Sequence, residues 1–522
     1  MSGRIPRSAL LLIATAGLAS LLEIVDTSIV NVAVPTMMGN LGVTLDEISW
    51  VVTGYIIANA IILPLAGWLA VRLGRRPYYI GCIILFTVAS MACGFAPNLL
   101  VLVLFRVVQG LAGGALLPTS QALIQEALPP EQAGMASALY GMVVIIGPTI
   151  GPPLGGFLTD HYGWRSIFDI NIPLGVLAAV MAYTFVQNHE LTAKELESDP
   201  RKHPIDFLGL AFLVMCIGAL QFVLERGQAD DWFDSNAIRI CSFLAVSSLV
   251  GFIWWELRTA YPIVALRLFK IPNLRYGAIM MGALGFILYG LIFFVPIFCS
   301  NSLGLTATQT GELFIPGAIT SGLLMPVVGM LLRKYDARIF AAVGLLCVCL
   351  CLIMLAYSSS RTGVDDFFWP LLVRGCAMAM MFVPLNAAVL GSFKGTQLGQ
   401  VAGITNLFRQ LGGSLGIAIL STYFTRSTRD AYGQLVGKVS ALNPALRYGT
   451  YRVQGMSMEM GMGTPARFAA QFDYYRLQRQ AFVIGFDHMM WTMAIFFMLA
   501  LIPLYFLRPL PFQKGGAAMD LH

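Results

Sequence analysis

The sequence has little charge for its length. Of its 522 residues only 11% are Asp, Glu, Lys or Arg, whereas 57% are hydrophobic. A soluble domain carries about 25% charged residues, which cover its surface, so the composition argues strongly against a soluble enzyme. The apolar content also excludes a disordered or collagen-like chain. The class that remains is a polytopic membrane protein.

Signatures of several other functional classes are missing as well. There is no GxxxxGK(S/T) phosphate loop, which disfavours a primary pump, and there is no HExxH or GxSxG motif. The five histidines lie in loops, near the ends of apolar segments or at the tail, so a membrane-embedded enzyme is disfavoured too. The net charge of +6 is small and scattered, which argues against nucleic-acid binding. The nine cysteines all fall in apolar segments without CxxC spacing, so we expect neither disulfides nor a metal site.

What the chain does have is a series of apolar segments about 20 residues long, the length of a membrane-spanning helix. Fourteen such segments can be counted: 9–34, 48–70, 78–96, 99–121, 134–158, 168–187, 206–225, 237–256, 275–299, 310–332, 339–357, 367–391, 400–424 and 486–507. The first is too long for a cleavable signal peptide, so we expect it to remain as a helix. The sequence therefore predicts an all-α polytopic membrane protein.

Positive charge alternates between the loops. The loop after the second segment carries Arg72 and Arg75, whereas the only charges in the loop before that segment are Asp46 and Glu47. Because positively charged loops stay in the cytoplasm, we expect both termini there. The basic segment 425–485 breaks the rule, but it is long enough to be exempt. We interpret it as a folded or partner-binding external segment.

A faint internal repeat divides the chain. Residues 67–76 are similar to residues 329–338, and Arg106 has a counterpart in Arg374, in each case eight helices later. Internal repeats are characteristic of secondary transporters. We therefore predict two six-helix halves and two inserted helices, with the following boundaries: 1–188, 189–260 and 261–522, the last including the segment 425–485.

Two acidic residues lie within the first apolar segment. Glu23 and Asp26 are three residues apart, so they share part of one helix face, which Thr27 extends. Burial and mutual repulsion both disfavour two charged carboxylates, so one of them can hold and release a proton. The alternative is an acid that pairs with an arginine for packing. Arg106 is the candidate partner, either tuning a coupling carboxylate or forming a fixed ion pair.

Other polar residues in or near the membrane form a candidate substrate cavity: Thr27, Asn31, Gln109, Glu312, Arg374, Arg409 and Asp487. Arg409 and Asp487 fit a structural role equally well. The acidic residues favour cationic or neutral amphiphiles, whereas the arginines favour anions such as fatty acids.

Four motifs resemble those of one family. Residues 67–76 read GWLAVRLGRR, residues 102–110 read LVLFRVVQG, and residues 147–158 read GPTIGPPLGGFL. They resemble, in order, the loop 2–3, helix 4 and antiporter signatures of the major facilitator superfamily. Residues 25–35, VDTSIVNVAVP, resemble the helix 1 signature of its fourteen-helix drug/proton antiporters.

The resemblance implies the major facilitator fold and a role in proton coupling for Glu23, Asp26 and Arg106. It also implies that certain residues serve conformational change: Gly67, Arg72, Gly74, Arg75, Gly147, Gly151, Pro152, Gly155 and Gly156. Glycines at every fourth position would equally serve close helix packing, and the arginines could simply be cytoplasmic charge. The family usually has an Asp where this chain has Val71, so no charge relay through that position is expected.

The stretch around Asn443, Pro444, Gln480 and Asp487 is similar to the EmrB/QacA type of this branch. That resemblance implies a bacterial inner-membrane protein, a proton-coupled multidrug efflux antiporter that exports amphipathic compounds by alternating access. It implies an EmrA-like periplasmic membrane-fusion adaptor and an outer-membrane channel as partners, and no cofactor besides the proton gradient. A proton-coupled uptake symporter of a small organic solute is the alternative, which the signature at 147–158 argues against.

Overall fold

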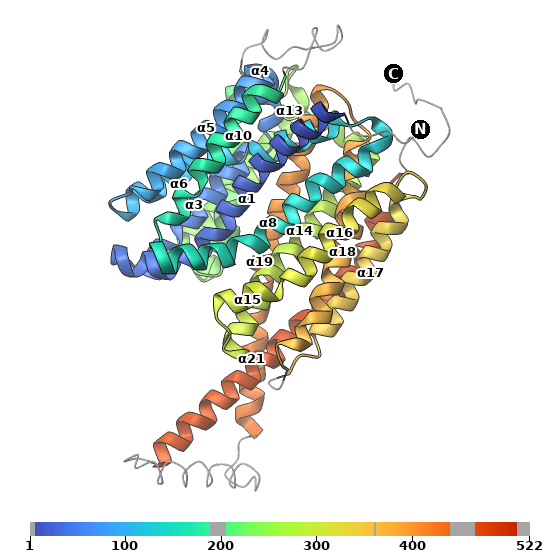
Figure 1. Ribbon diagram of the computed structural model, residues 1–522. Coiled ribbons are helices and arrows are strands. Elements are labelled where there is room, and N and C mark those ends of the chain that lie inside the picture. Colours follow the sequence, from blue (N-terminus) through green and yellow to red (C-terminus); the bar gives the residue numbers. More distant parts are fainter. Residues whose placement is uncertain (1–5, 188–204, 360–361, 439–464, 509–522) are drawn as a thin grey trace.

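The computed structural model describes residues 6–187, 205–359, 362–438 and 465–508 (Figure 1). Within these residues the chain forms helices joined by short connections, and no strand occurs. The all-α architecture predicted from the apolar segments is confirmed. Asn443 and Pro444 lie outside the described residues.

The first half of the molecule runs from α1 to α10. Its helices are α1 (Arg7–Leu41), α2 (Leu45–Ile48), α3 (Trp50–Ile62), α4 (Ala66–Leu73), α5 (Arg75–Gly94), α6 (Leu99–Gly113), α7 (Leu116–Ala127), η1 (Pro130–Gln132), α8 (Ala133–Tyr162), α9 (Ser166–Asp169) and α10 (Asn171–Phe185). α1 ends at Gly42, which adopts the left-handed conformation that glycine tolerates best. Asn98 caps α6 by accepting a hydrogen bond from the Val101 amide.

Two of the expected spans are broken near the middle. The 48–70 span divides into α3 and α4 at Pro64, whose ring removes a backbone donor. The 99–121 span divides into α6 and α7 at Gly114, where a Cβ would come within 2.5 Å of the Asn59 carbonyl oxygen. The break at Gly114 brings the end of α6 close against α3.

Two helices are inserted between the halves. They are α12 (Phe207–Arg226) and α13 (Asn236–Arg258), with the short turns η3 (Trp232–Asp234) and η4 (Leu266–Lys270). They pack against each other, and α12 also contacts α3 of the first half and α19 of the second.

The second half comprises α14 (Pro272–Phe298), η5 (Cys299–Leu303), α15 (Ala307–Leu313), α16 (Ile315–Leu331), α17 (Ala337–Leu355), η6 (Asp365–Phe367), α18 (Phe368–Leu390), α19 (Thr396–Lys438), α21 (Pro465–Leu499) and α22 (Leu501–Tyr505). Thr306 and Gln309 form a capping box that starts α15. Within the described residues, thirteen helical stretches are long and apolar enough to cross a membrane. The fourteenth expected segment, 400–424, lies inside α19, where polar residues such as Arg409 lower the hydropathy.

The segment 425–485 is largely helical where the structure describes it, so the predicted ends of the two flanking helices are wrong. α19 continues to Lys438 instead of ending near 424, and α21 begins at Pro465 instead of near 486. No proline interrupts either stretch after its first residue, so nothing in the sequence stops the helices at the membrane boundary. The two extensions touch through Tyr432 and Tyr474, whose ring centroids are 6.2 Å apart. α21 projects beyond the bundle on the side opposite the start of α1 (Figure 1).

The halves meet through close backbone contacts. A Cβ on Gly67 of α4 would overlap the backbone of Gln400 in α19. A Cβ on Gly134 of α8 would lie 2.7 Å from the Gly329 carbonyl oxygen of α16. Both contacts lie toward the side on which α1 begins, so the halves are held together there.

Candidate functional site

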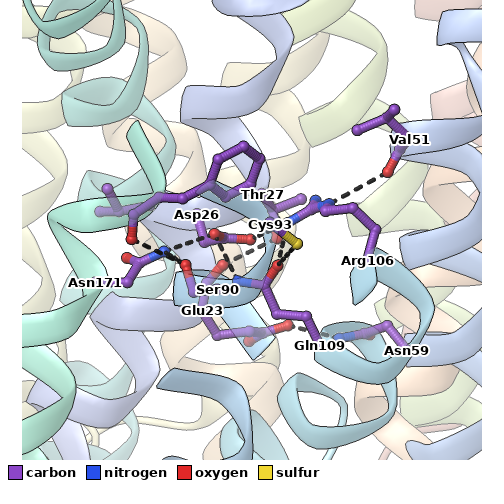
Figure 2. A network of polar contacts seen from close by, with 12 residues as sticks. Glu23, Asp26, Thr27, Val51, Asn59, Ser90, Cys93, Arg106, Gln109 and Asn171 are labelled. Carbon is purple, nitrogen blue, oxygen red and sulfur yellow. Dashed lines mark hydrogen bonds and ion pairs between the residues drawn. The ribbon is translucent and has the colours of Figure 1, made fainter. Parts of the chain in front are cut away.

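The two acidic residues of α1 are both buried. The exposed fraction is 4% for Glu23 and 0% for Asp26. Although they are less than one turn apart, they face different surroundings (Figure 2). The structure therefore separates the predicted acid pair into two distinct sites.

Asp26 accepts hydrogen bonds from three side chains on two other helices, α6 and α10. Its Oδ2 accepts a hydrogen bond from Arg106 Nη1 at 2.6 Å, which is also an ion pair. Its Oδ1 accepts from Gln109 Nε2 at 2.9 Å and from Asn171 Nδ2 at 2.7 Å. Both oxygens are thus satisfied and the charge is compensated, which is the arrangement of a fixed ion pair.

Arg106 is equally well fixed. Its Nε donates to the Val51 carbonyl oxygen at 3.2 Å, and its Nη1 also donates to Gln109 Oε1 at 2.7 Å. The guanidinium carbon lies 4.1 Å from the ring centroid of Tyr55, at cation–π distance. The pair with Asp26 therefore ties α1, α3 and α6 into one unit. Of the two interpretations of Arg106, the geometry favours the structural ion pair.

Glu23 has a different environment. Its Oε1 accepts one hydrogen bond, from Asn59 Nδ2 at 2.9 Å, and its Oε2 is buried without a hydrogen-bond partner. The positive charge of Arg409, in the second half, acts on this carboxylate electrostatically. A buried carboxylate oxygen without a donor is a natural place for a proton. Of the two acids, Glu23 is therefore the one with a carboxylate oxygen free of hydrogen bonds.

Arg409 belongs to a buried polar layer between the halves. Its Nη2 donates to Asn406 Oδ1 at 2.9 Å and its Nη1 to the Tyr289 hydroxyl at 3.2 Å. Asn406 in turn donates to Gln121 Oε1 at 2.6 Å. Gln121 Nε2 donates to Asn386 Oδ1 at 2.6 Å. We call Gln121, Asn386 and Asn406 the amide bridge, because it joins α7 of the first half to α18 and α19 of the second.

The other residues predicted for a substrate cavity are not brought to this layer. The Thr27 hydroxyl donates to the backbone of Glu23 at 2.9 Å, and Asn31 is exposed. Glu312 is exposed on α15. Asp487 on α21 is half-buried, and its Oδ1 has no hydrogen-bond partner. Arg374 is buried in α18, apart from the amide bridge.

The loop between α4 and α5 is fixed by its own motif residues. Gly74 has a φ of +86°, which favours glycine. Arg75 forms a bidentate ion pair with Glu126 at the end of α7. Its Nη1 donates to Oε2 at 2.5 Å and its Nη2 to Oε1 at 2.6 Å. Arg72 lies over the ring of Trp68 at 5.4 Å. This loop therefore connects the ends of α4, α5 and α7.

The glycine series of α8 faces α1. A Cβ on Gly147 would lie 2.6 Å from Ile24, and one on Gly155 would lie 2.9 Å from the Ile29 carbonyl oxygen. Gly151 lies against Ser28, and Gly156 is buried as well. Pro152, within the same motif, lies beside Gly311 of α15. The motif thus places α8 directly against the helix that carries Glu23 and Asp26.

Sequence reasoning missed the amides that complete these networks. Asn59, Gln121, Asn386 and Asn406 each lie inside an apolar helix, where an unsatisfied amide is costly. That placement was a usable signal, because a buried amide in a membrane helix needs a partner as much as a buried charge does. Their partners, however, come from helices far apart in the sequence.

Comparison with known proteins identifies the family. The model of the Major Facilitator Superfamily matches residues 16–417. The chain belongs to the Major Facilitator Superfamily. It is therefore a transporter of the multi-pass membrane type and not an enzyme.

Its relatives match over almost their full length. The multidrug export protein EmrB of Escherichia coli (strain K12) is 34% identical over 97% of this chain and 96% of that protein. The fatty acid resistance protein FarB of Neisseria gonorrhoeae is 33% identical over 96% of each chain. The EmrB/QacA type predicted from the motifs is confirmed.

Solved structures share the fold. The human organic anion transporter MFSD10 (TETRAN) superposes with a TM-score of 0.64 at 14% identity, over 96% of this chain and 100% of that one. The proton:xylose symporter XylE superposes with a TM-score of 0.63 at 14% identity, over 97% of each chain. The predicted major facilitator fold is confirmed.

Proposed function

We propose that this transporter is a proton-coupled antiporter that exports amphipathic compounds by alternating access between its two halves. The full-length similarity to multidrug export proteins supports export of drug-like compounds. The observation that carries the proton coupling is the Glu23 carboxylate, buried with one oxygen unbonded and acted on by Arg409 of the other half.

Glu23 can link protonation to the arrangement of the halves. When it is charged, its attraction to Arg409 across the interface stabilises the arrangement in which the halves meet at this layer. When it is protonated, that attraction is lost while the amide bridge remains. A proton that binds one arrangement better than another shifts the equilibrium between them. Asp26 and Arg106 serve this step by fixing α1 against α6.

The remaining parts of the proposal follow from the topology and the relatives. The segments 1–188 and 261–522 are the two moving halves, and 189–260 holds the inserted pair. Both termini lie in the cytoplasm of a bacterial inner membrane. The projecting ends of α19 and α21 then point to the periplasm, where a membrane-fusion adaptor that leads to an outer-membrane channel would contact them.

The test uses proteoliposomes with a pH-sensitive dye trapped inside and an imposed proton gradient. Ethidium, dodecanoate and a neutral lipophilic drug are added in turn, with protein-free vesicles as the control for passive proton leak. A compound that moves opposite to the protons only in the presence of the protein establishes antiport. Movement in the same direction as the protons would overturn the proposal in favour of uptake.

A further inference from the structure

Arg374 of α18 is a buried cation without a counter-ion in the described part of the chain. Its exposed fraction is 7%, and its Nε has no hydrogen-bond partner. None of the described carboxylates lies within ion-pair distance of it. A guanidinium cannot lose its charge, and burying it without an acceptor is costly. Such a group calls for an acceptor from outside the chain.

In the first half, the buried arginine at the corresponding position has an acidic partner. Arg106 lies in α6, eight membrane spans before Arg374, and Asp26 of α1 neutralises it at 2.6 Å. In the second half the place of α1 is taken by α14, Pro272–Phe298, which contains no acidic residue. The repeat therefore retains the buried arginine but not the acid that pairs with it.

The surroundings of Arg374 are apolar. Its guanidinium carbon lies 4.9 Å from the ring centroid of Phe314, and the Cys351 side chain of α17 lies near it. Leu371, one turn earlier on α18, is fully buried. Gly375 packs against Gly317 of α16, which brings the two backbones together beside this arginine. The site therefore offers one positively charged guanidinium surrounded by apolar side chains.

We propose that Arg374 binds the head group of an amphipathic carboxylate, with the alkyl chain along the apolar side chains around it. A carboxylate matches the planar guanidinium with two parallel hydrogen bonds, which an alcohol or a cation cannot form. This assignment rests on the proposed export function and narrows it to one substrate class. An anionic membrane lipid carries a similar head group and chain, so the experiment has to separate the two sources.

The experiment measures equilibrium binding to the full chain in nanodiscs of neutral phosphatidylcholine, with empty nanodiscs as the blank. Dodecanoate and dodecan-1-ol are titrated into the parent, Arg374→Gln, Arg374→Lys and Arg239→Gln. Arg239 is exposed on α13, so its substitution removes the same charge away from the site. We expect Arg374→Gln to weaken dodecanoate binding about tenfold or more while dodecan-1-ol binding stays unchanged, because a charge-assisted hydrogen bond is lost. Arg374→Lys should weaken dodecanoate binding by less, and Arg239→Gln should bind as the parent does.

Several outcomes would overturn the assignment. Parental dodecanoate binding by Arg374→Gln, or an equal loss for the acid and the alcohol, would show that Arg374 does not recognise the carboxylate. If Arg374→Gln does not fold, Arg374→Lys provides the test. Loss of the planar guanidinium should still lower the preference for dodecanoate over dodecan-1-ol. Displacement of dodecanoate when phosphatidylglycerol replaces part of the neutral lipid would assign the site to membrane lipid instead. No proton gradient is involved, so a failure here leaves proton antiport untouched, and a failure of antiport leaves this binding result standing.

Discussion

At the residue scale, two acids on one helix have different hydrogen-bond partners. Asp26 receives three hydrogen bonds and a full positive charge, whereas Glu23 receives one hydrogen bond and has a buried oxygen with none. A satisfied ion pair resists a change of charge, whereas a half-satisfied carboxylate can accept a proton without breaking a network. The proposed roles, a structural one for Asp26 and proton coupling for Glu23, rest on this difference.

Asp26→Asn should therefore destabilise the protein. The substitution leaves Arg106 buried and uncompensated, which costs on the order of 3 kcal/mol when one partner of a buried pair is removed. Thermal unfolding in detergent should show a clear drop in melting temperature. The double variant Asp26→Asn/Arg106→Gln should recover part of the loss, because the two residues act as a unit. A variant that melts like the parent but no longer moves protons would instead make Asp26 the coupling acid.

At the scale of elements, α8 and α1 depend on glycine for their contact. The α8 glycines meet Ile24, Ser28 and Ile29 at distances that leave no room for a methyl group. This contact fixes the helix that carries Glu23, the proposed coupling acid. The two extended helices α19 and α21 are the other distinctive elements, because they continue beyond the bundle as a pair.

Gly155→Ala should cost about 1–3 kcal/mol of stability, because its methyl group would press on the backbone of Ile29. The matched control is Gly81→Ala in α5, where a Cβ meets nothing within 4 Å. The control should be neutral or slightly stabilising, since alanine favours a helix over glycine. Both variants can be compared by melting temperature and by retention on size-exclusion chromatography. Equal effects at the two positions would contradict the role of Gly155 in packing.

The fold was more predictable from the sequence than the site. Apolar segments report each helix locally, so the all-α architecture followed from composition and length. The helix ends around 425–485 did not follow, because a polar helix outside the membrane lacks the hydrophobic signal of a span. The roles of Glu23 and Asp26 could not be separated either. The deciding partners, Asn59, Asn171 and Arg409, come from other helices, and only the tertiary arrangement brings them to one acid or the other.

At the scale of the whole molecule, the halves are joined on one side and linked at the middle. Gly67 and Gly134 bring the halves together toward the side on which α1 begins. The amide bridge links them at the level of Gln121 and Asn406. The positive charge of Arg409 acts on the buried Glu23 carboxylate from the second half. In the proposed cycle, the charge on Glu23 therefore acts on the contact between the two halves, which has to open and close during transport.

The measurement that tests this account most directly compares two transport modes in proteoliposomes for the parent, Glu23→Gln and the exposed control Glu131→Gln. One mode is uphill transport of a substrate driven by a proton gradient. The other is exchange of labelled for unlabelled substrate at equal pH on both sides, which needs alternating access but no proton transfer. We expect Glu23→Gln to retain exchange and to lose proton-driven transport, while Glu131→Gln matches the parent in both. Proton-driven transport at the parental rate in Glu23→Gln would contradict the central claim that Glu23 carries the coupling proton.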